Sequence, residues 1–191
     1  MNILVGCEES QAVTIELRKL GHNAFSCDII PSSGGHPEWH LEMDIMKVLF
    51  LQKWDLIILH PPCTKIAVSG NRWYGEGNRR HNERIEAVKW TQKLWDSAIR
   101  VCDKVALENP VGVLNKYGEF PQPNYIQPWQ FGHGETKKTG FWLHGLEPLK
   151  PTNIVEGREQ RIWKMPPTKD RGKLRSKTYP GIAKAIAEQW T

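Results

Sequence analysis

The sequence has no long apolar run, no clustered cysteines and no internal repeat. None of its stretches approaches the roughly 20 apolar residues that a membrane span needs, and the first residues lack the basic leader and cleavage site of a secretory signal. We therefore expect a cytoplasmic protein with no membrane partner. No Cys-x-x-Cys pair occurs among the four cysteines, which are Cys7, Cys27, Cys63 and Cys102. This indicates free thiols, not a disulfide framework or a cysteine-based zinc site.

The charge of the chain is only mildly positive. Lysine and arginine outnumber aspartate and glutamate by 26 to 21, a formal net charge of +5, which permits a polyanionic partner without requiring one. The excess is concentrated between residues 158 and 177, and either a solvated basic face or a phosphate-contacting face explains it. The nine tryptophans are spread along the whole chain, so core and interface packing explains them better than a base-stacking platform does.

Short apolar runs alternate with helical patterns over most of the chain, which is typical of an α/β protein with one main domain. Runs at 2–5, 23–27, 56–59, 104–107 and 139–143 predict strands. Helical spacing predicts a helix after Ser10 that stops at Gly21, a long helix from Asn82 to Cys102, and a closing helix from Gly181 to Trp190 that packs back on the sheet. We expect a doubly wound, mostly parallel sheet.

Polar residues follow the first two predicted strands. Gly6 closes the first strand, and Asp28 ends the second at the spacing where an acid can accept hydrogen bonds from a ribose. The segment from Gly6 to Ser10 has no Gly-x-Gly phosphate loop. This favours a nucleoside-containing ligand without a pyrophosphate, while a turn-capping role remains the alternative for Asp28.

A cysteine and a carboxylate follow the next two predicted strands. In His60-Pro61-Pro62-Cys63 the two prolines stiffen the turn and present the thiol just past a buried strand. Glu108 stands at the end of the following strand. A thiolate and a carboxyl proton donor suit conjugate addition to an electron-poor heteroaromatic ring, because one attacks carbon and the other protonates a ring nitrogen. A buried structural cysteine is the alternative.

These two segments resemble motifs of the DNA cytosine-5 methyltransferases, especially the short, divergent phage and prophage forms. Pro61-Pro62-Cys63 resembles the Pro-Cys catalytic motif, and Glu108-Asn109-Pro110 resembles the Glu-Asn-Val motif with proline in place of valine. The resemblance runs along nearly the whole chain. It implies a Rossmann-like S-adenosylmethionine-dependent methyltransferase sheet in the cytoplasm of a bacterial or phage-infected cell.

The resemblance also implies roles for individual residues. Cys63 would add to C6 of cytosine while Glu108 holds N3, and C5 would take the methyl group from S-adenosylmethionine. The implied cofactor contacts are Gly6, Cys7, Glu8, Asp28, Ile29, Asp44 and Pro61. The implied substrate contacts are Pro62, Thr64, Arg72, Asn109 and Lys137.

Lys138 is a third catalytic candidate, because Lys137 and Lys138 occupy the place of the family's arginine pair near the target base. Lysine lacks the bidentate fork of arginine. Ser176 to Gly181 resembles the closing motif that completes the cofactor pocket, without its usual asparagine.

The region before this closing motif is much shorter than the recognition region of typical family members. We expect a catalytic domain at 1–147, a reduced irregular basic lobe at 148–174, and a closing helix within 175–191. Selectivity for a DNA sequence should then be low, or a protein partner should supply it. The insertion at 31–40 and the loop at 69–80, which mixes arginines with aromatic residues, are expected to contact the substrate instead.

Three functional hypotheses remain. The first is methyl transfer to cytosine in DNA, with the target base flipped out of the duplex. The second keeps the chemistry but uses a free cytosine nucleotide. The third is a catalytically inactive relative that binds nucleic acid or cofactor to regulate another process, against which the presence of both Cys63 and Glu108 argues. No metal is expected, because the spacing of His36, His40, His60 and Cys63 fits no common zinc site.

Overall fold

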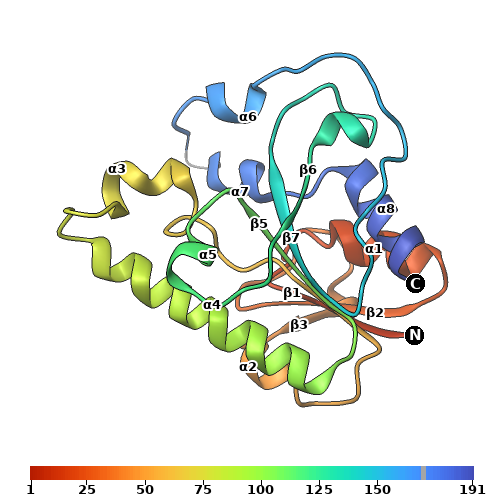
Figure 1. Ribbon diagram of the computed structural model, residues 1–191. Coiled ribbons are helices and arrows are strands. Elements are labelled where there is room, and N and C mark those ends of the chain that lie inside the picture. Colours follow the sequence, from red (N-terminus) through yellow and green to blue (C-terminus); the bar gives the residue numbers. More distant parts are fainter. Residues whose placement is uncertain (169–170) are drawn as a thin grey trace.

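The computed structural model describes residues 1–168 and 171–191. Seven strands form one sheet in the order β3-β2-β1-β4-β5-β7-β6 (Figure 1). β1 to β5 are parallel, whereas β7 is antiparallel to both β5 and β6. The strands are β1 (Asn2–Gly6), β2 (Asn23–Asp28), β3 (His40–Glu42), β4 (Leu56–Leu59), β5 (Val105–Pro110), β6 (Asn124–Ile126) and β7 (Thr139–His144). The expected mostly parallel α/β sheet is confirmed, and the short strands β3 and β6 are additions to it.

The strand order reverses between β1 and β4. The chain runs outward from β1 through β2 to β3, then returns to pair β4 with the other side of β1. Connections leaving β1 and β4 therefore diverge, and they leave a crevice at the carboxyl ends of these strands. This crevice is where an open parallel sheet binds its ligands.

Helices cover both faces of the sheet (Figure 1). On one face α1 (Ala12–Lys19) and α8 (Pro180–Trp190) pack together over Ile3, Val5 and Ile58. On the other face α2 (Ile45–Val48), α4 (His81–Val101) and α5 (Leu114–Tyr117) enclose a second core that includes Leu4, Ile57 and Trp142. The closing helix thus packs back on the sheet as expected. Three short helices complete the set: α3 (Asn71–Tyr74), α6 (Arg161–Lys164) and α7 (Arg171–Ser176).

The main elements form where the apolar pattern predicts them. All four residues of β4 are buried, as expected for a central parallel strand with both faces covered. α4 turns Val88, Leu94 and Ala98 inward at helical spacing. No helix in the described ranges is long and apolar enough to cross a membrane.

The helix starts differ slightly from the expected positions. α1 is preceded by Gln11 in a left-handed conformation (φ 56°), not by Ser10, and α4 begins after Arg80, not at Asn82. The end of α1 is as expected, since Gly21 takes a positive φ of 83° just beyond it. The α1 amides find another acceptor, because the Glu8 carboxylate accepts hydrogen bonds from Val13 N and Thr14 N at 2.7 and 3.3 Å.

The region expected to form an irregular lobe, 148–174, includes residues 169 and 170, which lie outside the described residues. Its other residues contain α6 and the start of α7, so α7 crosses the boundary expected at 174. Backbone hydrogen bonds fasten this lobe to the segment between β6 and β7: Gly132 N donates to Asn153 O at 2.7 Å, and Thr136 N to Glu159 O at 2.8 Å.

Candidate active site

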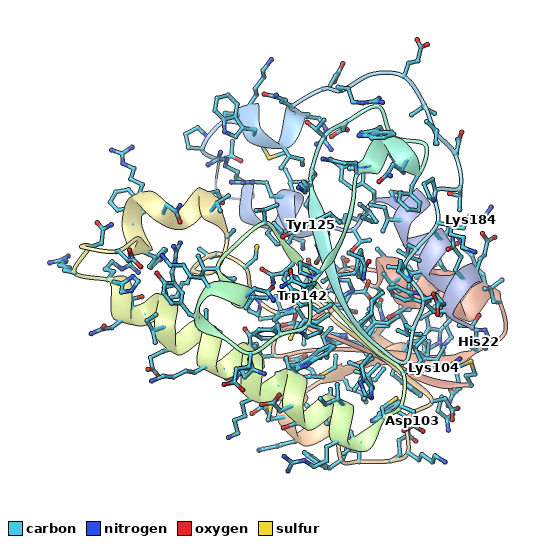
Figure 2. The ribbon with its side chains drawn as sticks, viewed as in Figure 1. His22, Asp103, Lys104, Tyr125, Trp142 and Lys184 are labelled. Atoms are coloured by element: carbon cyan, nitrogen blue, oxygen red, sulfur yellow. The ribbon has the colours of Figure 1, made fainter. Side chains whose placement is uncertain are left out.

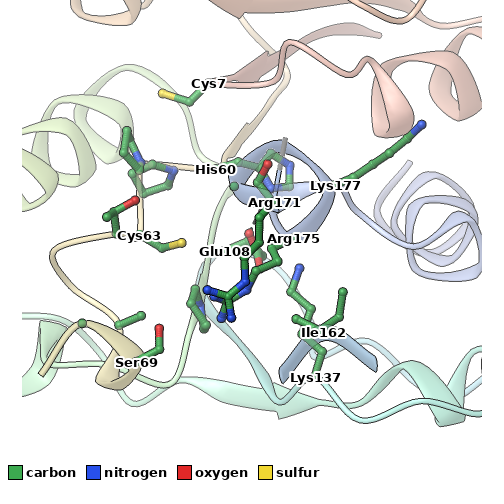
Figure 3. A pocket seen from close by; sticks show the side chains of 18 of the residues that line it. Cys7, His60, Cys63, Ser69, Glu108, Lys137, Ile162, Arg171, Arg175 and Lys177 are labelled. Carbon is green, nitrogen blue, oxygen red and sulfur yellow. Dashed lines mark hydrogen bonds and ion pairs between the residues drawn. The ribbon is translucent and has the colours of Figure 1, made fainter. Parts of the chain in front are cut away.

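A cavity of about 830 Å³ lies at the carboxyl ends of β1, β4 and β5 (Figure 3). Residues 7–10 after β1 form one side, and residues 60–64 after β4 form another. Glu108 of β5, Lys137, several residues between 67 and 80, and several residues between 171 and 178 contribute to the rest of the lining. Segments far apart in the sequence therefore meet around one space, whose volume is in the range of small-molecule sites.

Cys63 and Glu108 both line this cavity. In Figure 3 the sulfur of Cys63 points to the side where Glu108 lies. Burial raises the pKa of the Cys63 thiol, and the negative charge of Glu108 raises it further, while Lys137 and Arg175 act in the opposite direction. The thiol is thus protonated at rest. A nucleophilic role requires added positive charge or a proton acceptor when the ligands bind.

Glu108 has a buried partner in His60. Nδ1 of His60 lies 3.3 Å from Oε2 of Glu108, and the two side chains are only 10% and 14% exposed. Burial alone would raise the pKa of Glu108, but the hydrogen bond to His60 and the charge of Lys137 lower it overall. The carboxylate is therefore ionised near neutral pH, and it favours the protonated form of the His60 imidazole.

Buried polar side chains hold the turn that carries Cys63. Asn109 is 1% exposed and donates from Nδ2 to the carbonyl oxygen of Pro61 at 3.0 Å. Arg84, on α4 and 2% exposed, donates to the carbonyl oxygens of Lys65 and Ala67 at 2.6 and 3.2 Å. These bonds connect the turn to β5 and α4, so two neighbouring elements fix the position of the thiol.

The segment after β1 makes a tight turn without a glycine-rich loop. Gly6 is required by packing, because a Cβ there would lie 2.6 Å from Cδ1 of Ile45. Cys7 takes a left-handed conformation with φ 58°, which glycine usually adopts. Burial, together with the charges of Asp28 and Asp44, raises the pKa of Cys7, and this places both carboxylates beside the turn.

Asp28 and Asp44 lie next to the cavity but do not line it. Asp28 accepts hydrogen bonds from Ile29 N and Ile30 N at 2.7 and 3.3 Å, and Asp44 accepts one from Met46 N at 2.9 Å. The side chain of Ile29 is 76% exposed. This edge of the sheet therefore combines two carboxylates with exposed apolar surface.

The structure brings about half of the expected site residues to the cavity. The lining includes Cys7, Glu8, Pro61, Pro62, Cys63, Thr64, Glu108 and Lys137. Gly6, Asp28, Ile29, Asp44, Arg72 and Asn109 lie outside it. Lys138 also lies outside, and its Nζ sits 4.3 Å from the ring centre of Tyr125 on β6. Arg72 stacks over Trp73 at 5.2 Å, and Trp73 itself lines the cavity.

Several ionisable side chains that line the cavity were not among the expected site residues. Glu9, His60, Arg171 and Arg175 line the cavity, and Oε2 of Glu9 is buried with no hydrogen-bond partner in the described chain. The excess of lysine and arginine at 158–177 was the sequence signal for the two arginines. The proline-stiffened turn before Cys63 was the signal for His60. Within residues 1–168 and 171–191, no group of three or more His, Cys, Asp or Glu side chains could hold a metal ion.

The fold has known counterparts at low sequence identity. No protein-family model and no curated protein sequence matches the chain. Among solved structures, the chain is similar to a protein described as a DNA modification methyltransferase encoded within a prophage of E. coli, with TM-score 0.51 and 13% identity over 88% of this chain. It is also similar to the methyltransferase EhMeth of Entamoeba histolytica, with TM-score 0.53 and 13% identity over 84% of this chain. The chain spans 56% and 57% of those two proteins. The Rossmann-like fold of such methyltransferases is therefore the fold of this chain.

Proposed function

We propose that this protein transfers a methyl group from S-adenosylmethionine to C5 of cytosine in DNA. One observation carries the proposal: Cys63 and Glu108 line a single cavity that also includes the turn after β1. A nucleophile, a carboxyl group and the segment expected to hold the cofactor thus share one space. The fold shared with two methyltransferases supports the same conclusion.

The residues around this cavity fit S-adenosylmethionine. Asp28 and Asp44 offer carboxylates for ribose and adenine, beside the exposed side chain of Ile29. Oε2 of Glu9 has no hydrogen-bond partner in the described chain and lies 3.6 Å from Nζ of Lys173, which makes it a suitable acceptor for the cofactor's ammonium group. When bound, the cofactor supplies an electrophilic methyl group.

The chain's own residues perform the remaining steps. The Cys63 thiolate adds to C6 of a flipped cytosine, and Glu108 holds N3 as the ring accepts electron density. Lys137 lowers the pKa of both Glu108 and Cys63, so it stabilises their ionised forms. After C5 is methylated, water takes up the C5 proton, and the C5–H electrons re-form the C5–C6 double bond and expel the Cys63 thiolate.

Basic and aromatic residues at the rim of the cavity would bind the DNA. Arg171 and Arg175 come from α7, and Trp73 and Arg80 come from the opposite side. Trp73 is 58% exposed and can stack on a base, while the arginines can contact phosphates. Since the lobe is small, we propose that sequence selectivity is low or is supplied by a partner protein.

A free cytosine nucleotide is the second candidate substrate. Arg171 and Arg175 line the same cavity as Cys63, so a phosphate on the substrate could bind next to the reacting base. Methyl transfer from labelled cofactor to duplex DNA and to dCMP, measured side by side, distinguishes the two substrates.

The proposed function is tested by mass spectrometry of nucleosides from cells that express the protein. We expect additional 5-methylcytosine with the wild-type chain and a loss of more than about 10³-fold with Cys63→Ala, because the nucleophile is removed. Cys102→Ala is the matched control, since Cys102 is a buried free cysteine in the second core, away from the cavity.

Purified protein and DNA that contains 5-fluorocytosine provide the complementary test. We expect a covalent adduct through Cys63, because fluorine at C5 blocks the final elimination. An intact protein mass without an adduct, while bound cofactor is detected, would count against the methyltransferase proposal.

A further inference from the structure

His60 is a largely buried imidazole that contacts the carboxylate of Glu108 and feels the charge of Glu8. Its backbone N donates to Gly6 O at 2.9 Å, which fixes the residue between β1 and β4. Its Nδ1 lies 3.3 Å from Oε2 of Glu108, and its Nε2 is buried without a hydrogen-bond partner in the described part of the chain. Both His60 and Glu108 line the cavity that contains Cys63. The resemblance to the DNA cytosine-5 methyltransferases implied no role for this histidine.

We propose that His60 is a positioning residue that orients Glu108 and supplies, through Glu108, the proton that cytosine N3 takes up when Cys63 attacks. This inference rests on the proposed function. Its physical basis is the geometry, since Nδ1–H donates to one carboxylate oxygen and leaves the other free to face a base. A carboxylate held in this way cannot rotate away from N3.

The proton and electron movements balance within the site. The Cys63 thiol first loses its proton to water, the resulting thiolate forms a bond to C6, and the C5–C6 π electrons move through the ring to N3. The Nδ1 proton of His60 moves to the Glu108 carboxylate and from there to N3, so that His60 becomes neutral imidazole and Glu108 is again ionised. When the sulfur leaves at the end of the reaction, N3 returns the proton by the same route.

The charges that face His60 favour this arrangement. Burial lowers the pKa of His60, but the hydrogen bond and charge of Glu108, followed by the charge of Glu8, raise it overall, with Lys137 as a small opposing effect. Glu8 is 4% exposed, and its carboxylate is held by Thr14 Oγ1 at 2.7 Å. These charges favour a protonated imidazole beside an ionised Glu108.

The pairing can be measured without activity by following the imidazole signal of His60 with NMR as a function of pH. We expect Glu108→Gln to lower the pKa of His60 by about one unit or more, because a neutral amide cannot stabilise the imidazolium. His60→Asn identifies the signal by its loss. An unchanged pKa of His60 in Glu108→Gln overturns the proposal, whether or not the protein methylates DNA.

The proton-supply role is tested by the pH dependence of kcat/KM in His60→Asn, since asparagine keeps an N–H donor but does not titrate. Wild-type protein should show a bell-shaped profile, because only the state with one proton shared by Cys63 and His60 reacts. In His60→Asn we expect a rate reduced by about 10- to 100-fold that rises with pH without a descending limb.

His144→Asn is the matched control, because His144 is exposed at the far end of β7; it should keep the wild-type profile. A bell-shaped profile that persists in His60→Asn overturns the proton-supply role. If the wild-type protein methylates no cytosine at any pH, the proposed function fails, and the NMR titration still decides whether the two residues are paired.

Discussion

The turn after β4 and the lobe that follows β7 are built in opposite ways. The turn is held from beneath by Asn109 and Arg84, which are 1% and 2% exposed. The lobe exposes large apolar side chains instead: Ile154, Trp163 and Leu174 are 67%, 73% and 54% exposed. A segment held by buried hydrogen bonds resists displacement more than an exposed segment does.

This structural difference suits the turn and the lobe to different roles. The turn holds Cys63 in a defined position, because it is fastened to a sheet with a core on each face. The lobe brings positive charge to the cavity through α7 and has few buried apolar residues, among them Leu149 and Ile162. Changes in the turn should therefore affect chemistry, and changes in the lobe should affect substrate binding.

Asn109→Ala tests the role of the turn after β4 and should have the largest effect. It removes the donor to Pro61 O, so we expect kcat to fall by about 10- to 100-fold and the free energy of unfolding to fall by about 1–3 kcal/mol. Thermal unfolding and methyl transfer measure the two effects.

Asn115→Ala is the matched control for that variant. Asn115 donates to Phe120 O at 2.9 Å and accepts from Trp142 Nε1 at 2.8 Å, and none of these residues lines the cavity. It should lose stability without losing kcat. Equal losses of kcat in both variants would contradict a specific role for Asn109.

Arg175→Ala tests the role of the lobe in DNA binding and should have a smaller effect. Removing one phosphate contact should weaken DNA binding several-fold and reduce the slope of log K against log salt concentration by about one, with the free energy of unfolding changed by less than about 0.5 kcal/mol. Fluorescence anisotropy over a salt series measures the slope. Lys184→Ala, on the solvent side of α8 (Figure 2), is the control and should leave the slope unchanged.

The acid stability of the loop between the turn and α4 should show the smallest effect. Hydrogen bonds from Lys116 and Tyr117 lower the pKa of Glu76 to about 2, and those from Arg80 and Lys65 lower the pKa of Glu83 to about 2. A carboxylate with a lowered pKa stabilises the folded protein above its ordinary pKa, and this contribution is lost as the pH falls toward 2.

The double variant Glu76→Gln/Glu83→Gln should therefore lose less stability than the wild type on acidification from about pH 5 to pH 2. Both groups are exposed, so the difference should be small. Denaturant unfolding at several pH values measures it, and identical acid sensitivity of the two proteins would show that these ion pairs do not stabilise the loop.

The alternation of apolar and helical segments was enough to predict the central strands, the long helix and the closing helix. Each of these is stabilised by its own periodic apolar surface, as in β4 and α4. β3 and β6 have three residues each, which is too short for a periodic signal. Their formation depends on pairing with β2 and β7, which no local pattern reports.

Lys137 and Lys138 show why adjacent candidates can differ. No local sequence signal distinguishes these two lysines, but successive side chains of an extended chain point to opposite sides. Lys137 lines the cavity, whereas Lys138 lies over Tyr125. Their difference depends on how the strand is placed in the sheet.

The sequence by itself determined that a cysteine and a carboxylate would stand at the ends of neighbouring strands, because apolar runs and prolines are local signals. Only the tertiary structure decided that His60 would pair with Glu108, that Asn109 would hold Pro61, and that α7 would line the same cavity. These contacts join segments distant in the chain, and their energy depends on burial and orientation that arise only when the sheet assembles.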